Sequence, residues 1–481
     1  MRVVHLASEA QPWAKTGGLA DVLGSLPPAL ASRGADVTVM LPAYRTALRT
    51  AGTVERLGRV HAPVGSRMEP VDVLRVANAP VPTLLLAAPR YFDREGLYGD
   101  GGRDHPDNAE RFVVFCRAAL EWLRELATPP DVLHAHDWQA APALAFLRGT
   151  QALYPELAAT RTVQTVHNLA YQGRFWAADW HLLNLDPRWF TAEFLEFHGQ
   201  INFLKAGLVF ADAITTVSPR YAREIQTPAL GEGLDGVLRA RAERVHGILN
   251  GIDTVAWDPA GDPALPAHYD ATTLDGKAAC RAALRGELGL TPDEAPALVA
   301  MVTRLAEQKG IDTALGAAWG LVGGGAIQLA VLGSGDPHWE HALHELAARH
   351  PGRVAVRIGF DEPLARRLEA GADLFWMPSR FEPCGLTQLY SLRYGAVPIV
   401  HETGGLADTV TPWDAETGHG TGFLFRPCTT PALVAATRAA LAIRTDTAAW
   451  RRLIANGMAC DFSWDRSAAA YVDLYAALSR E

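Results

Sequence analysis

The chain has 481 residues, 49% of them hydrophobic and 20% charged, and its 53 acidic and 44 basic residues give a formal net charge of -9. This acidic balance argues against general binding to nucleic acids or anionic membranes, because both need a basic surface. The five cysteines form no C-x-x-C pair, which argues against a zinc cage or a disulfide framework. The apolar run in the opening stretch MRVVHLASEA is too short for a signal peptide or a membrane span, so we expect a cytoplasmic protein. The length predicts roughly two to four domains.

Short apolar runs alternate with helical segments along the whole chain. Uninterrupted runs of this kind are typical of parallel strands that helices cover on both faces, and the alternation predicts the α/β class. The expected strands are 3–7, 37–41, 83–87, 132–135, 162–166, 213–217, 297–302, 327–332, 354–358, 374–377 and 397–400.

One segment interrupts this alternation and predicts a domain boundary. Residues 252–275 are dense in Pro, Asp, Gly and Thr, which is typical of a linker. We therefore expect two doubly wound lobes, 1–255 and 256–460, with a cleft between them. The closing segment, 461–481, spaces its aromatic and leucine residues roughly as a helix does, and we expect it to brace the first lobe.

The hexapeptide TGGLAD occurs twice, at 16–21 and at 403–408, each time after a predicted strand and before a helical segment. A strand, a glycine-rich turn and a helix in this order present backbone N–H groups to an anion. Doubly wound sheets bind ligands beyond the carboxyl ends of their strands, so both copies are expected at binding edges. The alternative is that the hexapeptide is only favourable turn chemistry. Lys15 adds a cation to the first copy, unless it is an ordinary surface lysine.

Two further loops carry charged residues after predicted strands. In VTRLAEQKG, Arg304 and Lys309 flank Gln308, and two cations at a strand end suit a diphosphate; the alternative is a pair of surface cations. In PSRFEPCGLTQ, Glu382 lies on a turn, and the amides of 384–387 open the next helix as a second anion site. Glu382 is alternatively a favourable charge at a helix start.

The histidines give no metal-site pattern. His134 and His136 alternate in HAHDW, and His167 follows another strand, but no third histidine or carboxylate lies at the spacing of a zinc site. No D-x-D motif is present, so the sequence does not support a site for a divalent metal and a sugar nucleotide.

Taken together, the motifs in these loops resemble those of the bacterial glycogen synthases and plant starch synthases. These enzymes are retaining glucosyltransferases of the GT-B fold, which has two Rossmann-like lobes. The resemblance runs from the first residue to the last. The motifs that carry it are KTGGLADV (15–22), HAHDWQA (134–140), TVHNLAYQG (165–173), ILNGID (248–253), RLAEQKG (304–310), PSRFEPCGLTQLY (378–390) and TGGLADTV (403–410).

The resemblance implies transfer of glucose from ADP-glucose to the non-reducing 4-hydroxyl of an α-1,4-glucan, without a metal or other cofactor. It implies that Arg304 and Lys309 hold the diphosphate, that Glu382 binds glucose hydroxyls, and that His167 and Asn250 line the sugar pocket. The catalytic set that follows is Glu382, Arg304, Lys309, His167 and Asp137. The donor-binding set is Lys15, Gly18, Asp21, Asn250, Gln308, Phe360, Cys384, Gly385, Leu386, Thr387, Gly404 and Gly405.

Two positions bear on how closely the family pattern is kept. Phe360 stands where the family often has a tyrosine that stacks on adenine. Tyr390 stands eight residues after Glu382, where many retaining GT-B enzymes carry a second glutamate, and this agrees with the glycogen synthases. Retention normally suggests a carboxylate nucleophile, and none is evident. The resemblance therefore implies same-face attack, with the departing phosphate taking the acceptor proton.

Four other functions compete with this interpretation. They are a transferase that uses UDP-glucose, such as a sucrose synthase; a glucan phosphorylase, which needs pyridoxal phosphate on a lysine; a dinucleotide dehydrogenase; and a glucan-binding protein without activity. The dehydrogenase is disfavoured because no G-x-G-x-x-G with a following acid succeeds a predicted strand.

Overall fold

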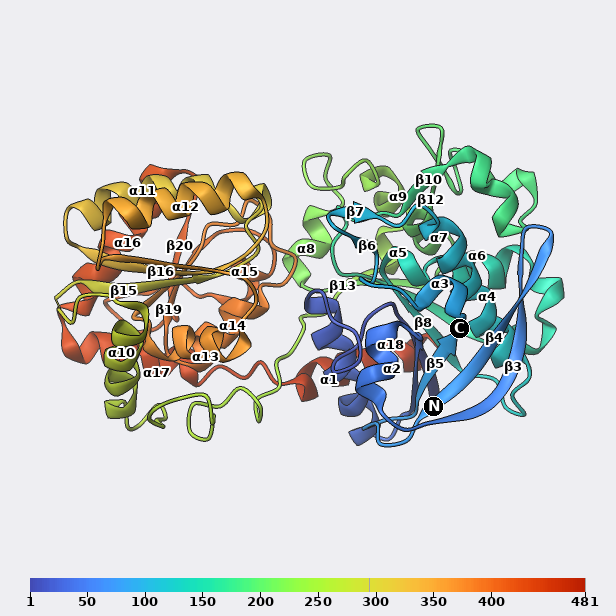
Figure 1. The fold of residues 1–481 in the computed structure, drawn as a ribbon, viewed down its shortest axis with the longest axis horizontal. Helices are drawn as coiled ribbons and strands as arrows, with labels where there is room; N and C mark the ends of the chain where they lie inside the picture. Colours follow the sequence, from blue (N-terminus) through green and yellow to red (C-terminus); the bar gives the residue numbers. More distant parts are fainter. Residues whose placement is uncertain (294, 481) are drawn as a thin grey trace. The chain divides into compact units, whose positions relative to one another are not determined.

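A computed structural model describes residues 1–293 and 295–480 of the chain (Figure 1). It divides into two compact units. The first unit comprises Met1–Gly251 and the residues from Trp464 onward, and the second comprises Ile252–Ser463. Glu481, the last residue of the predicted closing helix, lies outside the described residues.

The first unit is built on a nine-stranded sheet with the order β14-β13-β9-β8-β1-β2-β5-β4-β3. Its strands are β1 (Arg2–Leu6), β2 (Asp36–Pro42), β3 (Val54–Val64), β4 (Arg67–Val76), β5 (Thr83–Ala87), β8 (Val132–His136), β9 (Arg161–Val166), β13 (Ala213–Thr216) and β14 (Val245–Gly247). All neighbours are parallel except for the pairs that involve β4. Since successive strands run outward in both directions from β1, the order reverses between β1 and β8.

Helices and two small sheets complete the first unit. The helices are α1 (Gly18–Ser32), α2 (Arg45–Ala51), α3 (Pro89–Phe92), α4 (Asn108–Arg124), α5 (Asp137–Ala140), α6 (Pro142–Gly149), α7 (Phe203–Phe210), α8 (Pro219–Glu224), α9 (Asp235–Arg239) and α18 (Trp464–Leu478). The small sheets consist of β6 (Gly99–Asp100) with β7 (Arg103–Asp104), and of β10 (Arg174–Trp176), β12 (Gln200–Asn202) and β11 (Glu196–Phe197).

The closing helix α18 belongs to the first unit although 212 residues of the second unit precede it in the chain. It packs against α1, and Arg33 pairs with Asp465 at 2.7 Å. Tyr471 and Tyr475 are buried, and the Tyr475 hydroxyl lies 2.7 Å from Nδ1 of His134 in strand β8. These contacts make α18 part of the packing beneath the central strands.

The second unit has a six-stranded parallel sheet with the order β17-β16-β15-β18-β19-β20. Its strands are β15 (Ala297–Val302), β16 (Ile327–Gly333), β17 (Val354–Ile358), β18 (Leu374–Met377), β19 (Val397–His401) and β20 (Phe423–Phe425). Numbered along the chain, this is the order 3-2-1-4-5-6 of dinucleotide-binding folds, which reverses between β15 and β18.

Helices cover both faces of this sheet, as Figure 1 shows for the yellow-to-red part of the chain. They are α10 (Asp275–Leu288), α11 (Ile311–Gly323), α12 (Pro337–Arg349), α13 (Glu362–Gly371), α14 (Leu386–Arg393), α15 (Gly404–Thr409), α16 (Thr430–Arg444) and α17 (Thr447–Met458). Leu298 and Ala300 of β15 pack with α10 and α13, whereas Val299 and Met301 pack with α11, α12 and α16. Burial on both faces explains why these strands are uninterrupted apolar runs.

The segment between β14 and α10 contains no helix or strand among its described residues, as its composition predicts. It is nevertheless fixed by specific contacts within the second unit. Asp262 pairs with Arg366 and accepts a hydrogen bond from Tyr394, and the Tyr269 hydroxyl donates to the Tyr394 carbonyl at 2.7 Å. The segment is therefore an ordered part of that unit's surface.

The predicted α/β class is confirmed, and every strand expected from an apolar run is present with its ends shifted by no more than one residue. The antiparallel hairpin of β3 and β4 was not predicted. Its buried residues, such as Val60, Ala62 and Val64, alternate with exposed ones because one face of the hairpin is open to water. Across the described residues, no helix combines the length and the apolar character needed to cross a membrane.

Candidate active site

The loops singled out in the sequence follow the strands that flank the reversal point in each sheet. In the first unit, the loop containing Lys15 follows β1, and Asp137 follows β8 directly. In the second unit, Arg304 and Lys309 follow β15, and Glu382 follows β18. At a reversal point the loops on the two sides run in opposite directions and leave a crevice at the carboxyl ends of the strands. This is the place in each sheet where ligands of doubly wound folds bind.

The first glycine-rich turn is held by a buried carboxylate. The side chain of Glu9, which is 4% exposed, accepts hydrogen bonds from the Thr16 amide (2.5 Å), the Thr16 hydroxyl (2.6 Å) and the Gly17 amide (3.2 Å). Tyr98 donates a further bond to this carboxylate at 2.6 Å. Two of the amides that were predicted to face an anion, those of Thr16 and Gly17, therefore donate to Glu9 instead. The turn still enters α1 at Gly18, which is exposed.

Lys15 and Asp21, both predicted to bind the donor, form an ion pair with each other at 2.6 Å. Their side chains are about one quarter exposed. The pair spans the turn, because Lys15 precedes Gly17 and Asp21 lies in the first turn of α1. It therefore ties the Lys15 ammonium to the first turn of α1.

A second cluster in the first unit contains Asp137 and His167. Asp137 has a left-handed backbone (φ 55°), and its carboxylate accepts a hydrogen bond from the His167 amide at 2.7 Å. The His167 ring in turn lies 3.0 Å from Nδ1 of His136 through its Nε2. Both predicted residues are only partly accessible. The structure therefore brings Asp137 and His167, 30 residues apart in the chain, into direct contact.

Burial raises the pKa of the Asp137 carboxyl to about 7, with a smaller contribution from the nearby Glu9. The amides of His167 and Asn168 oppose this shift. The folded protein consequently holds a proton on Asp137 that the unfolded chain releases near pH 4. Its contribution to stability is complete below pH 4 and is lost as the pH rises towards 7.

We therefore expect Asp137→Asn to stabilise the protein relative to the parent above pH 7 and to have little effect near pH 4. The asparagine oxygen can still accept the His167 amide, but the side chain never ionises. Thermal unfolding of both proteins between pH 4 and pH 9 measures this difference. A gap that does not widen with pH would contradict the raised pKa.

In the second unit, the predicted cations and acid form one connected network. Nζ of Lys309 lies 2.6 Å from Oε2 of Glu382, and Ser379 donates to the same oxygen at 2.9 Å. Gln308 donates to the Phe381 carbonyl and accepts from Arg304 at 3.2 Å. Glu382 is 6% exposed, whereas Arg304 is exposed. Glu382 is thus paired with Lys309, and Arg304 extends the positive charge to the surface.

Glycines allow the loops of this site to touch through their backbones. A Cβ atom on Gly310, which has φ 63°, would lie 2.0 Å from the Pro378 carbonyl oxygen. A Cβ on Gly405 would lie 2.0 Å from the Cys384 carbonyl oxygen, and the Gly405 amide donates to the Glu382 carbonyl at 3.0 Å. The loops after β15, β18 and β19 therefore pack directly on one another, and any residue larger than glycine at position 310 or 405 would clash. Gly404, the other predicted glycine of this turn, is buried and has φ 43°.

The two TGGLAD copies consequently serve different purposes. The first is shaped by Glu9 and leaves an exposed helix start at Gly18, whereas the second buries its two glycines and uses Gly405 for close approach to another loop. Both follow a strand of their sheet at its carboxyl end, as predicted. Their common sequence reflects a shared local geometry of strand, turn and helix.

Helix α14 begins at Leu386, with Gly385 as its N-cap in the left-handed conformation (φ 88°). The predicted helix start at Cys384 is thus two residues too early, because the chain must first turn through Gly385. The amides of Leu386 and Thr387 open the helix beside Glu382. Helix starts have unpaired N–H groups, so this end of α14 can accept an anion.

The remaining predicted residues lie near strand ends. Asn250 follows β14, is 4% exposed, and its side-chain oxygen has no hydrogen-bond partner among the described residues. Phe360 follows β17 and is 80% exposed. Tyr390 stacks on Trp257 with ring centroids 3.7 Å apart. Tyr390 therefore packs against an aromatic ring, which the glutamate found at this position in other retaining GT-B enzymes could not do in the same way.

Sequence spacing missed a third histidine near His134 and His136. His5 of β1 lies beside His134 in the parallel pairing, and ring nitrogens of the three histidines lie within 4.8 Å of one another. These nitrogens bond one another, the ring of His167, or the hydroxyls of Tyr475 and Thr165, apart from Nε2 of His5. A metal ion would have to displace those bonds.

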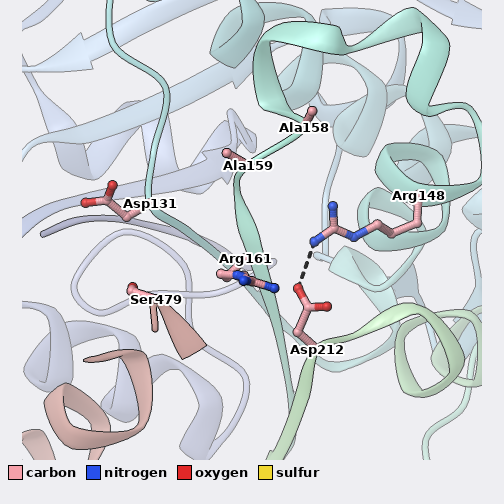
Figure 2. A pocket seen from close by; sticks show the side chains of 7 residues that line it. All are labelled: Asp131, Arg148, Ala158, Ala159, Arg161, Asp212 and Ser479. Carbon is pink, nitrogen blue, oxygen red and sulfur yellow. Dashed lines mark hydrogen bonds and ion pairs between the residues drawn. The ribbon is translucent and has the colours of Figure 1, made fainter. Parts of the chain in front are cut away.

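A separate hollow of about 500 Å³ lies at the opposite edge of the first sheet (Figure 2). Asp131, Arg161 and Asp212 stand at the amino ends of β8, β9 and β13. Figure 2 shows Arg148 reaching Asp212. The two side chains pair at 2.7 Å, and Asp212 also accepts a hydrogen bond from the Thr162 amide. These charges satisfy groups at the strand starts, and we assign no ligand to the hollow.

Comparison with known proteins agrees with the geometry. The family model described as starch synthase catalytic domain matches residues 2–240, and that described as glycosyl transferases group 1 matches residues 289–457. The glycogen synthase of Anaeromyxobacter dehalogenans (strain 2CP-C) is 53% identical over 481 residues, all of both chains. The glycogen synthase of Syntrophotalea carbinolica is 46% identical, over 99% of this chain and 98% of its own. The chain belongs to the glycogen synthase family.

Solved structures extend this family assignment to the fold. The catalytic domain of starch synthase IV from Arabidopsis thaliana, solved with ADP and acarbose, has a TM-score of 0.91 and 33% identity, over 100% of this chain and 99% of that chain. Sucrose-phosphate synthase from Thermosynechococcus elongatus shares only the fold, with a TM-score of 0.60 and 18% identity. As a member of the glycogen synthase family, the chain is a glycosyltransferase with the GT-B fold.

Proposed function

We propose that the protein transfers glucose from ADP-glucose to the non-reducing 4-hydroxyl of an α-1,4-glucan with retention of configuration. The observation that carries the proposal is the network at the reversal point of the second sheet. There the two cations Arg304 and Lys309 and the backbone amides at the amino end of α14 all belong to loops that follow β15 and β18. A diphosphate is the leaving group that such a site suits best.

The reaction needs this positive charge more than it needs a nucleophile. The bond between glucosyl C1 and the diphosphate oxygen breaks, the acceptor O4 bonds to C1 on the same face, and the O4 proton passes to the departing diphosphate. Negative charge therefore accumulates on the leaving group as the bond breaks. Preorganised cations and amides stabilise that charge without rearranging in the transition state.

Other roles follow from the family resemblance and from the local chemistry. Glu382, held by Lys309 and Ser379, is proposed to accept hydrogen bonds from glucosyl hydroxyls. His167 and Asn250 are proposed to line the sugar pocket; the Asn250 side-chain oxygen, buried without a partner among the described residues, supports a role as an acceptor. Phe360 is proposed to stack on the adenine because this aromatic residue is 80% exposed.

The decisive experiment incubates the protein with glycogen and ADP-glucose, with a chelator present, and measures ADP release together with glucan elongation. A parallel reaction with UDP-glucose tests the donor base. We expect ADP release that depends on glycogen and a slower reaction with UDP-glucose. Binding of glycogen without ADP release would overturn the proposal, and a faster reaction with UDP-glucose would reassign the donor.

A further inference from the structure

Three imidazole rings form a continuous hydrogen-bonded chain that ends at His167. Nδ1 of His5 lies 2.9 Å from Nε2 of His136, and Nδ1 of His136 lies 3.0 Å from Nε2 of His167. His5 is in β1 and His136 ends β8, so the chain crosses the reversal point of the first sheet. His5 and His136 are fully buried.

Each ring in this chain is neutral at physiological pH. Burial lowers the pKa of His5 and of His167 to about 3, and that of His136 falls well below its ordinary value through burial and neighbouring histidines. A neutral imidazole has one N–H and one bare nitrogen. Each ring must therefore donate through one nitrogen and accept through the other, and the chain has only two possible directions.

The buried end of the chain selects between these directions. Nε2 of His5 is buried and has no hydrogen-bond partner among the described residues. If the protons pointed towards His5, this atom would carry an N–H with no acceptor, which is rarer and costlier in a protein interior than an unfilled lone pair. The favoured direction therefore places a proton on Nδ1 of His5, which donates to His136.

The same direction continues to the other end. His136 accepts through Nε2 and donates through Nδ1 to Nε2 of His167, so the His167 proton must lie on Nδ1. That nitrogen has no hydrogen-bond partner among the described residues, and the His167 side chain is partly accessible. The chain thus ends in an N–H group that is available to a ligand.

We propose that His5 and His136 are positioning residues that fix His167 as its Nδ1–H tautomer, so that it offers the glucosyl group a hydrogen-bond donor. This inference rests on the proposed role of His167 in the sugar pocket. The tautomer itself depends only on the chain of rings. A failure of one can therefore be told apart from a failure of the other.

The first test needs only the parent protein. Labelling the histidines with ¹⁵N and recording two-bond proton–nitrogen correlations distinguishes an Nδ1–H ring from an Nε2–H ring, and the spectrum of His167→Gln identifies the signals of His167. We expect His5, His136 and His167 all to be Nδ1–H tautomers at pH 7. An Nε2–H pattern for His167 would overturn the proposal.

The second test reverses the chain. In His5→Asp the side chain, once ionised, can only accept, so His136 must donate to it, and the His167 proton moves to Nε2. Because burial raises the pKa of a carboxyl group, the spectra are recorded up to pH 9, where the introduced group is ionised. We expect the His167 pattern to switch and kcat to fall about tenfold, the effect of losing one hydrogen bond, with the KM for glycogen nearly unchanged. A switched tautomer with unchanged kcat would show that His167 does not act as a donor, and an unswitched tautomer would show that His5 does not set the chain.

His134 provides the matched control. It is equally buried in the same cluster, and its ring lies 4.2 Å from that of His136, but it bonds Tyr475 and Thr165 and is not part of the chain. His134→Gln is expected to leave the His167 tautomer and kcat unchanged. If His167→Gln itself retains full activity, the proposed role of His167 fails while the tautomer assignment stands.

Discussion

Lys309→Ala is expected to lower kcat by about a hundred- to a thousandfold, the usual effect of removing one preorganised donor from a site of developing charge. The ammonium of Lys309 is the partly buried cation of the second unit's network, with its side chain 14% exposed. Single-turnover measurements with saturating ADP-glucose and glycogen would separate this loss from weaker binding. A kcat within a few-fold of the parent would exclude Lys309 from the leaving-group site.

The same variant should also lose stability, because Lys309 is the ion-pair partner of the buried Glu382. Removing one member of a buried pair leaves an uncompensated charge and costs about 3 kcal/mol, although Ser379 still donates to Glu382. Lys309→Ala combined with Glu382→Gln removes both charges and is expected to recover most of the melting temperature. Activity is not expected to recover, because Glu382 is itself proposed to bind the glucosyl group. Measuring kcat of Lys309→Ala well below its melting temperature separates the loss of activity from unfolding.

Arg304→Ala is expected to lower kcat by a similar factor, about a hundredfold or more, but without loss of stability. Arg304 is exposed, and it donates a hydrogen bond to the partly buried Gln308. Substitutions of this kind usually change stability by about 0.5 kcal/mol or less. Paired kcat and melting-temperature measurements check both parts.

A matched control for Arg304 is Arg367→Ala in the same unit. Arg367 pairs with Glu287 on the surface, between α13 and α10, so its loss removes a cation and an ion pair away from the network. We expect unchanged kcat for this variant. Equal losses of activity in Arg304→Ala and Arg367→Ala would point to a general effect of net charge and not to the proposed diphosphate site.

Strands buried on both faces could be predicted from the sequence, and half-exposed strands could not. Apolar runs such as 297–302 and 354–358 correspond to β15 and β17 without any shift. The hairpin of β3 and β4 carries charged residues such as Arg56 and Asp72 on its open face, and a search for continuous apolar runs passes over it. Its signal was the alternation of Val60, Ala62 and Val64.

The site shows the same division. Motif spacing placed Lys309 and Glu382 after the correct strands, but it could not show that they pair across 73 residues of sequence. Glu9 was missed because its partners are the amides of its own loop and the distant Tyr98, and His5 because its partner His136 is 131 residues away. Their signal was position alone: both lie within or just after β1, the strand beside the reversal point.

The return of α18 to the first unit has a consequence for synthesis on the ribosome. Residues 252–463 are continuous and can complete their packing while translation proceeds, whereas the amino-terminal portion must wait for residues beyond 463. Until then, the surface of α1 and the His134 strand that Tyr471 and Tyr475 cover remains bare. The segment that is synthesised first therefore completes its packing last. A nascent chain stalled before α18 would expose that surface to chaperones.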